Sequence, residues 1–341
     1  TYVDKCPVIV DGNSYKSFES QKSALENWQL ESPDSDLFNG EEIFLNIGTP
    51  RTMDTMLPIA LYQESRENVL LVGGASETNC CAAIVNSIIK SFMIQDGHVE
   101  IWGHERNSMF RRYNDVWNNY KTCSAIEEIC ERIYNLKESI FNNDEDKKII
   151  VLMGFERIYA DFELYDSSYN KASSSGDIPG LVDGDDEEVS LFEFLNNELG
   201  PDELSNRIDA DKNNISIEPD IITGDLDLTH GNGVYDAKED FNYILKRGSR
   251  LGYHFIWVAD AVSDLRQNRI DLEYFRHKIA FNLSRDDSWE IFGSKIASDL
   301  GTHICQYSDG IKKNSFHPYI HKELSWDGWY VDEDGIAKNE F

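Results

Sequence analysis

The sequence predicts an α/β protein built on a doubly wound, mainly parallel sheet that is interrupted by an acidic insertion. Short apolar runs alternate with segments of helical composition along most of the 341 residues, an order typical of such a sheet. One run, IIVLMGF at 149–155, is continuously apolar, as expected of a strand that is buried on both faces. The stretch 173–240 breaks the pattern with a dense series of carboxylates.

The first elements follow one another in a regular order. A strand is predicted at 43–47, and a second in NVLLVGG at 68–74. The next segment, CCAAIVNSIIKSFM at 80–93, has the length and composition of a buried helix. HVEIWG at 98–103 is predicted to be a further strand.

The remaining elements continue the alternation on both sides of the acidic stretch. A helix at 124–140 is predicted to begin with a capping box at Ser124 and Glu127. Its apolar residues recur at helical spacing, at positions 126, 129, 133, 136 and 140. A helix and then a strand are predicted within 241–260, and a last strand at 277–284.

These elements divide the chain into four parts. Residues 1–40 are predicted to be an N-terminal extension, 41–172 the first part of the core, 173–240 an insertion and 241–341 the second part of the core. The insertion holds 19 acidic and 3 basic residues, a net charge of −16 out of −30 for the chain. Because burying so many unpaired carboxylates is prohibitive, we expect it to lie outside the core and to mediate an interaction.

Charge and composition exclude several classes of protein. A net charge of −30 repels phosphate backbones and disfavours nucleic acid as the partner. No apolar run reaches the length of about 20 residues that spans a bilayer, so we expect no direct membrane contact. Six cysteines without metal-ligand spacing indicate free thiols in the cytoplasm. Since the chain begins at Thr1, we expect it to be part of a longer protein.

The segment NVLLVGGASETNC places a loop between a strand and a helix, the setting of a phosphate-binding P-loop. Its candidate nucleotide-binding residues are Gly73, Gly74, Thr78, Asn79 and Cys80. Thr78 stands where the second glycine of the motif belongs, Asn79 at the lysine and Cys80 at the magnesium-binding hydroxyl. Without the lysine, this loop supplies no cation to the transferring phosphoryl group.

A second requirement of NTPases, an acid at the tip of an apolar strand, is also unmet. Gly154 and Phe155 occupy the positions expected for the two carboxylates. Glu156 follows one residue later and, by strand alternation, is expected on the other face. Taken alone, each segment is equally well explained as an ordinary strand and turn. Together they predict an ATPase fold without catalytic residues.

The region after the insertion resembles the motor domains of the FtsK/SpoIIIE family of RecA-like translocases. ILKRGSRLGYHFIWVAD is similar to a helix and strand of that family, with Gly248, Gly252 and His254 in register. FRHKIAFNLSRDDSWEIFG is similar to a later strand and turn, where Asp287 and Ser288 match. The resemblance implies a RecA-like doubly wound fold.

The resemblance extends from about Glu41 to Tyr319, outside the insertion, and departs from the family at decisive places. Asp260 replaces a glutamine at a strand end, and Ser249 stands where an arginine is expected, with Arg250 one place on. Degenerate motor domains occur in this family in the multidomain ATPases of type VII secretion. The resemblance therefore implies a scaffold or regulatory module of a larger translocase, with other domains or subunits as partners and protein as a better-suited cargo than DNA.

An active translocase motor with an unconventional loop is the alternative. It requires cations near the phosphates, for which the sequence offers Lys90, Arg247 and Arg250. We predict that no cofactor binds; ATP and magnesium are the cofactors if the degenerate loop still functions. Salt-dependent DNA binding would favour the alternative.

The acidic stretch also contains candidates for a calcium site. Asp209, Asp211 and Asn213 have the spacing of the first ligands of a calcium-binding EF-hand. Asn214 replaces the glycine of that motif, which favours a solvated acidic loop. DLDLTHGNGVYDAKED is a similar near match.

Two arginines and two cysteines complete the candidates. Arg276 and Arg285 could act in trans on a neighbouring subunit's nucleotide, although ion-pair or surface roles are commoner for arginine. Cys80 and Cys81 lie at a helix N-terminus, a position where the pKa of a thiol can be lowered.

Overall fold

The computed structural model describes residues 15–22, 43–51, 57–73, 78–113, 115–117, 119–162, 236–324, 329–333 and 335–339. The chain divides into two compact units, Thr1–Tyr165 together with Asp236–Phe341, and Asp166–Tyr235. All described residues belong to the first unit. Residues 173–235 of the predicted insertion therefore lie outside the described residues, and with them the EF-hand-like residues 209–214 and all but the last five residues of the second such segment.

The strands of the described part are short and mostly buried. In chain order they are β1 (Ile43–Asn46), β2 (Gly48–Pro50), β3 (Pro58–Leu61), β4 (Val69–Val72), β5 (His98–Gly103), β6 (Lys121–Cys123), β7 (Lys148–Met153), β8 (Tyr253–Ala259), β9 (His277–Ala280), β10 (Cys305–Ser308), β11 (Lys313–Pro318), β12 (Trp329–Val331) and β13 (Ala337–Asn339).

Nine of these strands form one sheet in the order β2-β11-β10-β9-β4-β8-β7-β5-β6. The part from β9 to β6 is parallel throughout, whereas β10, β11 and β2 extend it as antiparallel strands. The predicted fold class, a doubly wound and mainly parallel α/β sheet, is confirmed. The antiparallel strands beyond β9 were not predicted.

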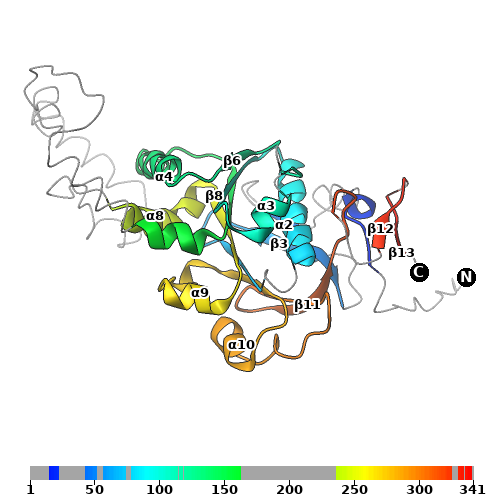
Figure 1. Cartoon of the computed structure of the whole chain (residues 1–341). Helices are drawn as coiled ribbons and strands as arrows, with labels where there is room; N and C mark the ends of the chain where they lie inside the picture. Colours follow the sequence, from blue (N-terminus) through cyan, green and yellow to red (C-terminus); the bar gives the residue numbers. More distant parts are fainter. Residues whose placement is uncertain are drawn as a thin grey trace, which may run out of the picture. The chain divides into compact units, whose positions relative to one another are not determined.

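The helices cover both faces of the sheet (Figure 1). The helices with both ends among the described residues are α2 (Thr78–Met93), α3 (Ser108–Tyr113), α4 (Ile126–Phe141), α8 (Ala237–Arg247), α9 (Val262–Gln267) and α10 (Arg285–Phe292), with 3₁₀ turns η2 (Gly248–Leu251) and η3 (Leu272–Tyr274). In Figure 1, α2 and α3 lie on one side of the sheet, while α4 and α8 pack together on the other.

The parallel strands are buried on both faces, as their continuous apolar runs predict. In register across three strands, Trp102 pairs with Leu152 and Leu152 with Trp257, and all three side chains are fully buried. Each such side chain stabilises the fold by about 1.5–3 kcal/mol relative to an exposed position.

Helix α2 is buried around nearly its whole circumference because it is covered on two sides. The antiparallel pair β1 and β3 packs over it, opposite the sheet. The backbone N–H of Asn46 donates to Ser91 Oγ at 3.0 Å, and Gln95 Nε2 donates to the Phe44 carbonyl at 2.7 Å. The helix that follows the candidate nucleotide loop is thus fixed on every side.

Helix α4 has the predicted apolar stripe, but the predicted capping box is wrong. Ala125 takes the N-cap position, and no side chain caps it. The helix therefore starts one residue late, so that Glu127 occupies the second helical position instead of the third, from which a glutamate reaches back. Ser124 Oγ donates to Glu105 Oε1 at 3.4 Å instead.

The two flanks of the predicted insertion are ordered parts of the core. Residues 155–162 are helical. Asp236 is the N-cap of α8 and accepts a hydrogen bond from the Glu239 N–H at 2.9 Å. Asp240, in the first turn of α8, is buried and pairs with Lys137. Residues 236–240, the end of the predicted insertion, therefore belong to a packed helix.

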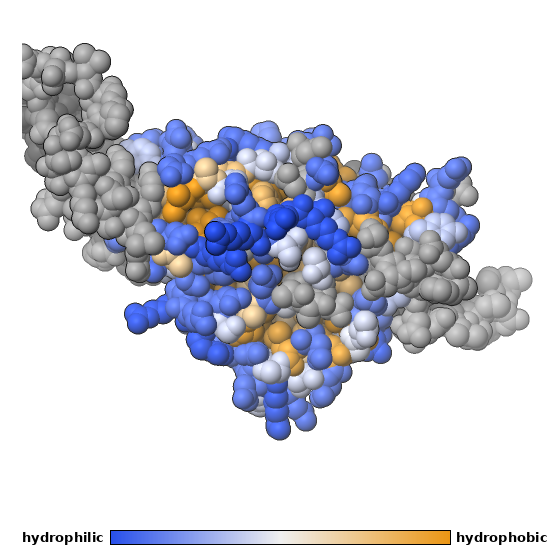
Figure 2. Space-filling model, in the orientation of Figure 1, coloured by the Kyte–Doolittle hydropathy of each residue, from blue (hydrophilic) through white to orange (hydrophobic). Residues whose placement is uncertain are grey.

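The surface of the described residues is mostly hydrophilic, with separate apolar patches between the polar areas on the face seen in Figure 2. No helix in the described part of the chain combines the length and apolarity that crossing a bilayer requires.

Candidate functional site

The predicted nucleotide loop lies at the carboxyl edge of the sheet, where β4, β7 and β8 end together. Val72 is in register with Ala259, and Met153 with Val258. From β4 the chain continues to β5 on one side, whereas from β8 it continues to β9 on the other. Such a reversal opens a crevice at the strand ends, the usual ligand site of doubly wound sheets.

Gly73 begins the loop with a backbone that favours glycine. Its φ of +97° lies in the left-handed region, and its N–H donates to the Ala259 carbonyl at 3.1 Å. A β-carbon at Gly73 would lie 3.4 Å from Phe281 Cβ. Residues 74–77, including the predicted Gly74, lie outside the described residues.

The residue at the lysine position of the motif is bound to a neighbouring helix. Asn79, in the first turn of α2, accepts a hydrogen bond from the Tyr113 hydroxyl at 2.5 Å. Tyr113, at the end of α3, is buried. The Asn79 side chain is thereby held against α3, and Thr78, the first residue of α2, is half-buried.

The residue at the hydroxyl position is also paired. Cys80 Sγ lies 3.0 Å from His303 Nδ1, and only 1% of Cys80 is exposed. The next thiol contradicts the expectation of a lowered pKa: burial, assisted by the charge of Asp260, strongly raises the pKa of Cys81. The sequence reasoning considered the helix N-terminus alone and missed the desolvation of this side chain.

Phe155, at a predicted carboxylate position, is an apolar core residue. Strand β7 ends at Met153, and Gly154 turns the chain with a φ of +60°. The Phe155 ring packs 4.8 Å from Phe241 and 5.5 Å from Trp257, measured between ring centroids. An acid at this position would be buried among aromatic rings.

Glu156 lies close to two other carboxylates at this edge. Because the chain turns helical at Phe155, the alternation rule used to place Glu156 does not apply to it. Burial, together with the charges of Asp260 and Asp264, raises the pKa of Glu156 to about 7. Glu156 Oε2 is buried without a hydrogen-bond partner among the described residues.

Asp260 and Arg157 complete the charged groups at the edge. Burial and the charge of Asp264 raise the pKa of Asp260, while the charge of Arg157 opposes this shift. Sequence reasoning noted Asp260 only as a departure from the family and did not single out Arg157. The position of Asp260 after an apolar strand was the available signal for the acid.

Several solved structures are similar to this chain over most of its length. The conjugation coupling protein TcpA, in a monomer form with ATPγS, has a TM-score of 0.48 and 9% identity, covering 89% of this chain and 82% of its own. EssC (ATPases 2 and 3) from Geobacillus thermodenitrificans has a TM-score of 0.45 and 10% identity, covering 86% of this chain and 46% of its own.

The cytoplasmic domain of the type VII secretion ATPase EccC from Thermomonospora curvata is similar too, with a TM-score of 0.41 and 12% identity over 86% of this chain and 30% of its own. This chain thus spans less than half of the EssC and EccC chains it resembles. Identities of 9–12% describe a likeness of fold alone. No family model matches the sequence, and no curated protein sequence matches it.

The cations suggested for an active motor are remote from the degenerate loop. Lys90 lies in the last turn of α2, about 15 Å along the helix axis from Cys80 at 1.5 Å per residue. Arg247 and Arg250 precede β8 and so lie at the opposite edge of the sheet. Arg250 Nε donates to Ser65 Oγ at 3.1 Å.

The two proposed trans-acting arginines differ in their surroundings. Arg276 forms ion pairs with Glu64 and with the buried Glu67. Arg285 is exposed at the start of α10.

An open polar hollow of about 310 Å³ lies near the ends of β5 and β6, lined by His104, Glu105, Arg106, Ser124 and Asp161. Its lining carries both signs of charge. Burial and the charges of Arg157 and Arg106 lower the pKa of His104, which keeps this imidazole neutral at pH 7. The hollow therefore adds little positive charge for a phosphate.

Proposed function

We propose that this chain is a catalytically degenerate, FtsK/SpoIIIE-like domain that serves as a scaffold or regulatory module of a larger translocase. The observation that carries the proposal is the pairing of Asn79 with Tyr113 and of Cys80 with His303. These contacts occupy the two side-chain positions that bind phosphate and magnesium in a working loop.

The electrostatics of the edge support the same conclusion. Residues 73–81 contain no lysine or arginine, whereas Glu156, Asp260 and Asp264 raise the negative charge nearby. A nucleotide triphosphate entering here meets these carboxylates without the loop lysine that normally offsets its charge. We infer that ATP does not bind at physiological concentration.

Titration calorimetry with magnesium and ATP tests this inference on the purified chain. We expect no heat of binding up to millimolar ATP and no hydrolysis. Binding at millimolar or lower concentration, or turnover near 1 per second as in ordinary motors, would overturn the proposal. The variant carrying Asn79→Lys and Cys80→Thr is the matched comparison, because it restores both missing side chains and leaves the loop glycines unchanged.

An active motor is the second candidate, and one observation favours it. Glu156 is a buried carboxyl with a pKa of about 7 at the edge where a catalytic base is required. In that case Glu156→Gln abolishes ATP hydrolysis by the natural chain. If the cargo is DNA, binding falls steeply with salt; a flat salt response favours protein cargo.

The scaffold role predicts an interaction with other domains or subunits of a translocase. The acidic residues 173–235 are our candidate for the contact, since their 16 acidic and 2 basic residues carry a net charge of −14 out of −30 for the chain. Charged surfaces of one sign favour a partner of opposite charge. We propose a basic protein surface as that partner.

A further inference from the structure

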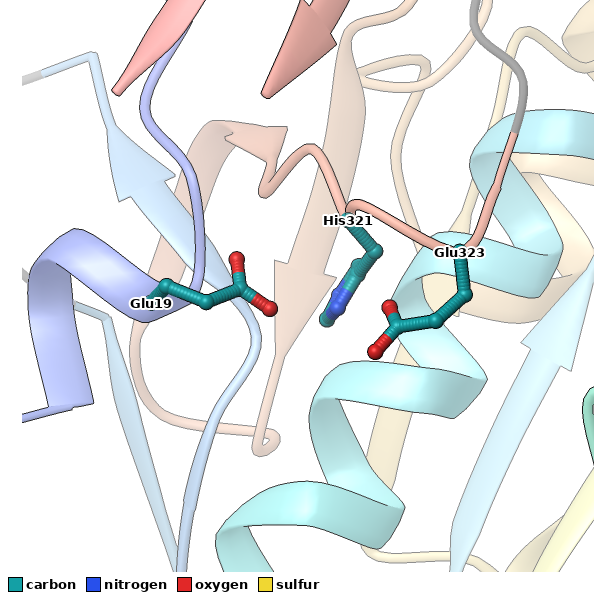
Figure 3. Close-up of side chains that lie close together, drawn as sticks. All are labelled: Glu19, His321 and Glu323. Carbon is teal, nitrogen blue, oxygen red and sulfur yellow. The ribbon is translucent and has the colours of Figure 1, made fainter. Parts of the chain in front are cut away.

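A cluster of ionisable side chains joins the two ends of the described core to helix α2. Glu19 comes from the segment 15–22, and His321 and Glu323 come from the chain after β11; Figure 3 shows the imidazole between the two carboxylates. Backbone hydrogen bonds hold these segments together: the Phe18 N–H donates to the Ile320 carbonyl at 3.1 Å.

The tautomer of His321 is fixed by Ser87 on α2. The Ser87 hydroxyl donates its one proton to the Ala83 carbonyl at 2.8 Å. It must therefore accept the hydrogen bond that joins it to His321 Nε2 at 2.8 Å. Nε2 carries the proton, and the lone pair of the imidazole is on Nδ1.

That lone pair has no hydrogen-bond partner in the described part of the protein, and His321 is 1% exposed. A neutral imidazole whose other nitrogen is hydrogen-bonded is the form that ligates metals.

A second orphaned acceptor lies in the same cluster. Glu19 Oε2 is buried without a hydrogen-bond partner among the described residues. One ligand atom each from Glu19, His321 and Glu323 lies within 4.8 Å of the others. The side chain of Glu323 is 45% exposed, so the cluster opens to solvent on that side.

The ammonium of Lys90 supplies the positive charge that pairs with the two carboxylates of this cluster. Its Nζ lies 2.8 Å from Glu19 Oε1 and 2.9 Å from Glu323 Oε1. The ammonium leaves Glu19 Oε2 and His321 Nδ1 unsatisfied, because its contacts go to the other carboxylate oxygens. Lys90 is also on a flexible stem that can turn outward.

We propose that Glu19, His321 and Glu323 bind a divalent transition-metal ion of the zinc class, with the ammonium of Lys90 competing for the same carboxylates. One imidazole nitrogen and two carboxylate oxygens suit zinc and similar ions, whereas magnesium and calcium prefer oxygen ligands alone. The bound ion links the segment 15–22 to the segment 321–323, and Ser87 holds its histidine ligand against helix α2.

Calorimetric titration of zinc chloride into the EDTA-treated, dialysed chain tests the site. We expect one saturable ion per chain that magnesium chloride does not replace. Glu323→Gln keeps the size of an exposed side chain and should weaken zinc binding by about tenfold or more. Ser87→Ala, which frees the imidazole tautomer, should weaken binding by about tenfold.

Lys90→Met distinguishes this site from ordinary metal adsorption, because removing a cation from the cluster should tighten zinc binding by about tenfold. Cys80→Ser is the matched control, because it removes the thiol of the separate Cys80–His303 pair. It should leave the affinity for zinc unchanged. Absence of saturable zinc binding in both the natural chain and Lys90→Met overturns the proposal. So does an affinity that Glu323→Gln and Ser87→Ala leave unchanged, or one that Cys80→Ser abolishes.

Discussion

Glu67 and His277 meet inside the core, where Glu67 Oε2 lies 2.9 Å from His277 Nε2 and both side chains are buried. Arg276 contacts the other oxygen of the carboxylate, and the Tyr307 hydroxyl lies 2.9 Å from His277 Nδ1. This network stands where β4 and β9 begin, at the edge opposite the degenerate loop. It ties the two strands together through charge and contributes to stability.

Glu67→Gln is expected to lower the free energy of unfolding by about 3 kcal/mol at pH 7. The change removes the buried carboxylate that Arg276 and His277 contact. Urea denaturation followed by tryptophan fluorescence measures the change. Glu64→Gln is the matched control: Glu64 also pairs with Arg276, at 3.1 Å, but its side chain is 67% exposed. We expect that control to change stability by less than about 1 kcal/mol.

The stabilisation by Glu67 also has a defined pH dependence. Burial alone would raise the pKa of Glu67, but the hydrogen bond from His277 and the charges of His277 and Arg276 bring this pKa below its ordinary value. The stabilisation is therefore complete above the unfolded pKa of about 4.3 and is lost as the pH falls through the lower folded pKa. A stability difference from Glu67→Gln that stays constant from pH 7 to pH 3 would contradict this.

Glu156 should show the opposite dependence. Its pKa of about 7 in the folded chain exceeds the unfolded value, so the native state holds the proton more tightly. The cost of ionising Glu156 develops as the pH rises from about 4.5 to 7, and reaches about 3 kcal/mol above that range. Glu156→Gln should consequently stabilise the chain at pH 8 and change little at pH 4.5.

Thermal denaturation at the two pH values measures this effect. Glu131→Gln, on the exposed side of α4, is the control. It should change the melting temperature by the same small amount at both pH values. A Glu156→Gln variant that is destabilised at pH 8 would show that the ionised carboxylate has a partner, as an active site requires.

The parallel core was predictable because its strands are buried on both faces and therefore have continuously apolar sequences. The runs before Gly73 and Gly154 show this clearly, since nearly every residue of β4 and β7 is buried. Strands β10 and β11 escaped prediction because polar side chains interrupt their apolar residues: β10 is buried throughout but contains Gln306 and Ser308, and β11 begins with exposed or half-buried residues. Gln306 and Ser315 hydrogen-bond to each other at 2.8 Å.

Only the residue types of the candidate site were predictable from the sequence, and not their contacts. The absence of a lysine at Asn79 is visible in the sequence, but its partner Tyr113 lies 34 residues away on another helix. His303 approaches Cys80 from a segment 223 residues distant. Contacts between such separated residues depend on how the elements pack, and no local pattern indicates them.

Gly252, one of the glycines that match the FtsK/SpoIIIE motif, can be tested for steric constraint by comparison with Gly310. Both have positive φ, +85° and +89°, so each substitution by alanine carries the left-handed penalty of about 1–2 kcal/mol. A β-carbon at Gly252 would lie 2.3 Å from the Asp146 carbonyl oxygen, whereas at Gly310 it meets nothing within 4 Å. Gly252→Ala should therefore cost several kcal/mol, and clearly more than Gly310→Ala. Equal losses in urea denaturation would mean that the η2–β8 turn relaxes freely.

The core should fold without the residues between its two halves. The rings of Phe162 and Phe241 lie 6.3 Å apart, and the Tyr159 hydroxyl donates to Asn242 Oδ1 at 3.1 Å. The chain thus leaves and re-enters the core at one aromatic cluster, which a short linker can bridge. Asp236 must stay, because its side chain caps α8.

Replacing residues 166–235 by a flexible glycine–serine linker should give a folded protein that unfolds cooperatively, with a melting temperature within several degrees of the natural chain. It should also lose binding to a basic protein partner, because the acidic segment is gone. The same deletion with Asp236→Ala is the control and should cost about a further 1 kcal/mol through loss of the cap. If the shortened chain fails to fold, or if calcium raises the melting temperature of the natural chain by several degrees, the segment is structural or binds metal.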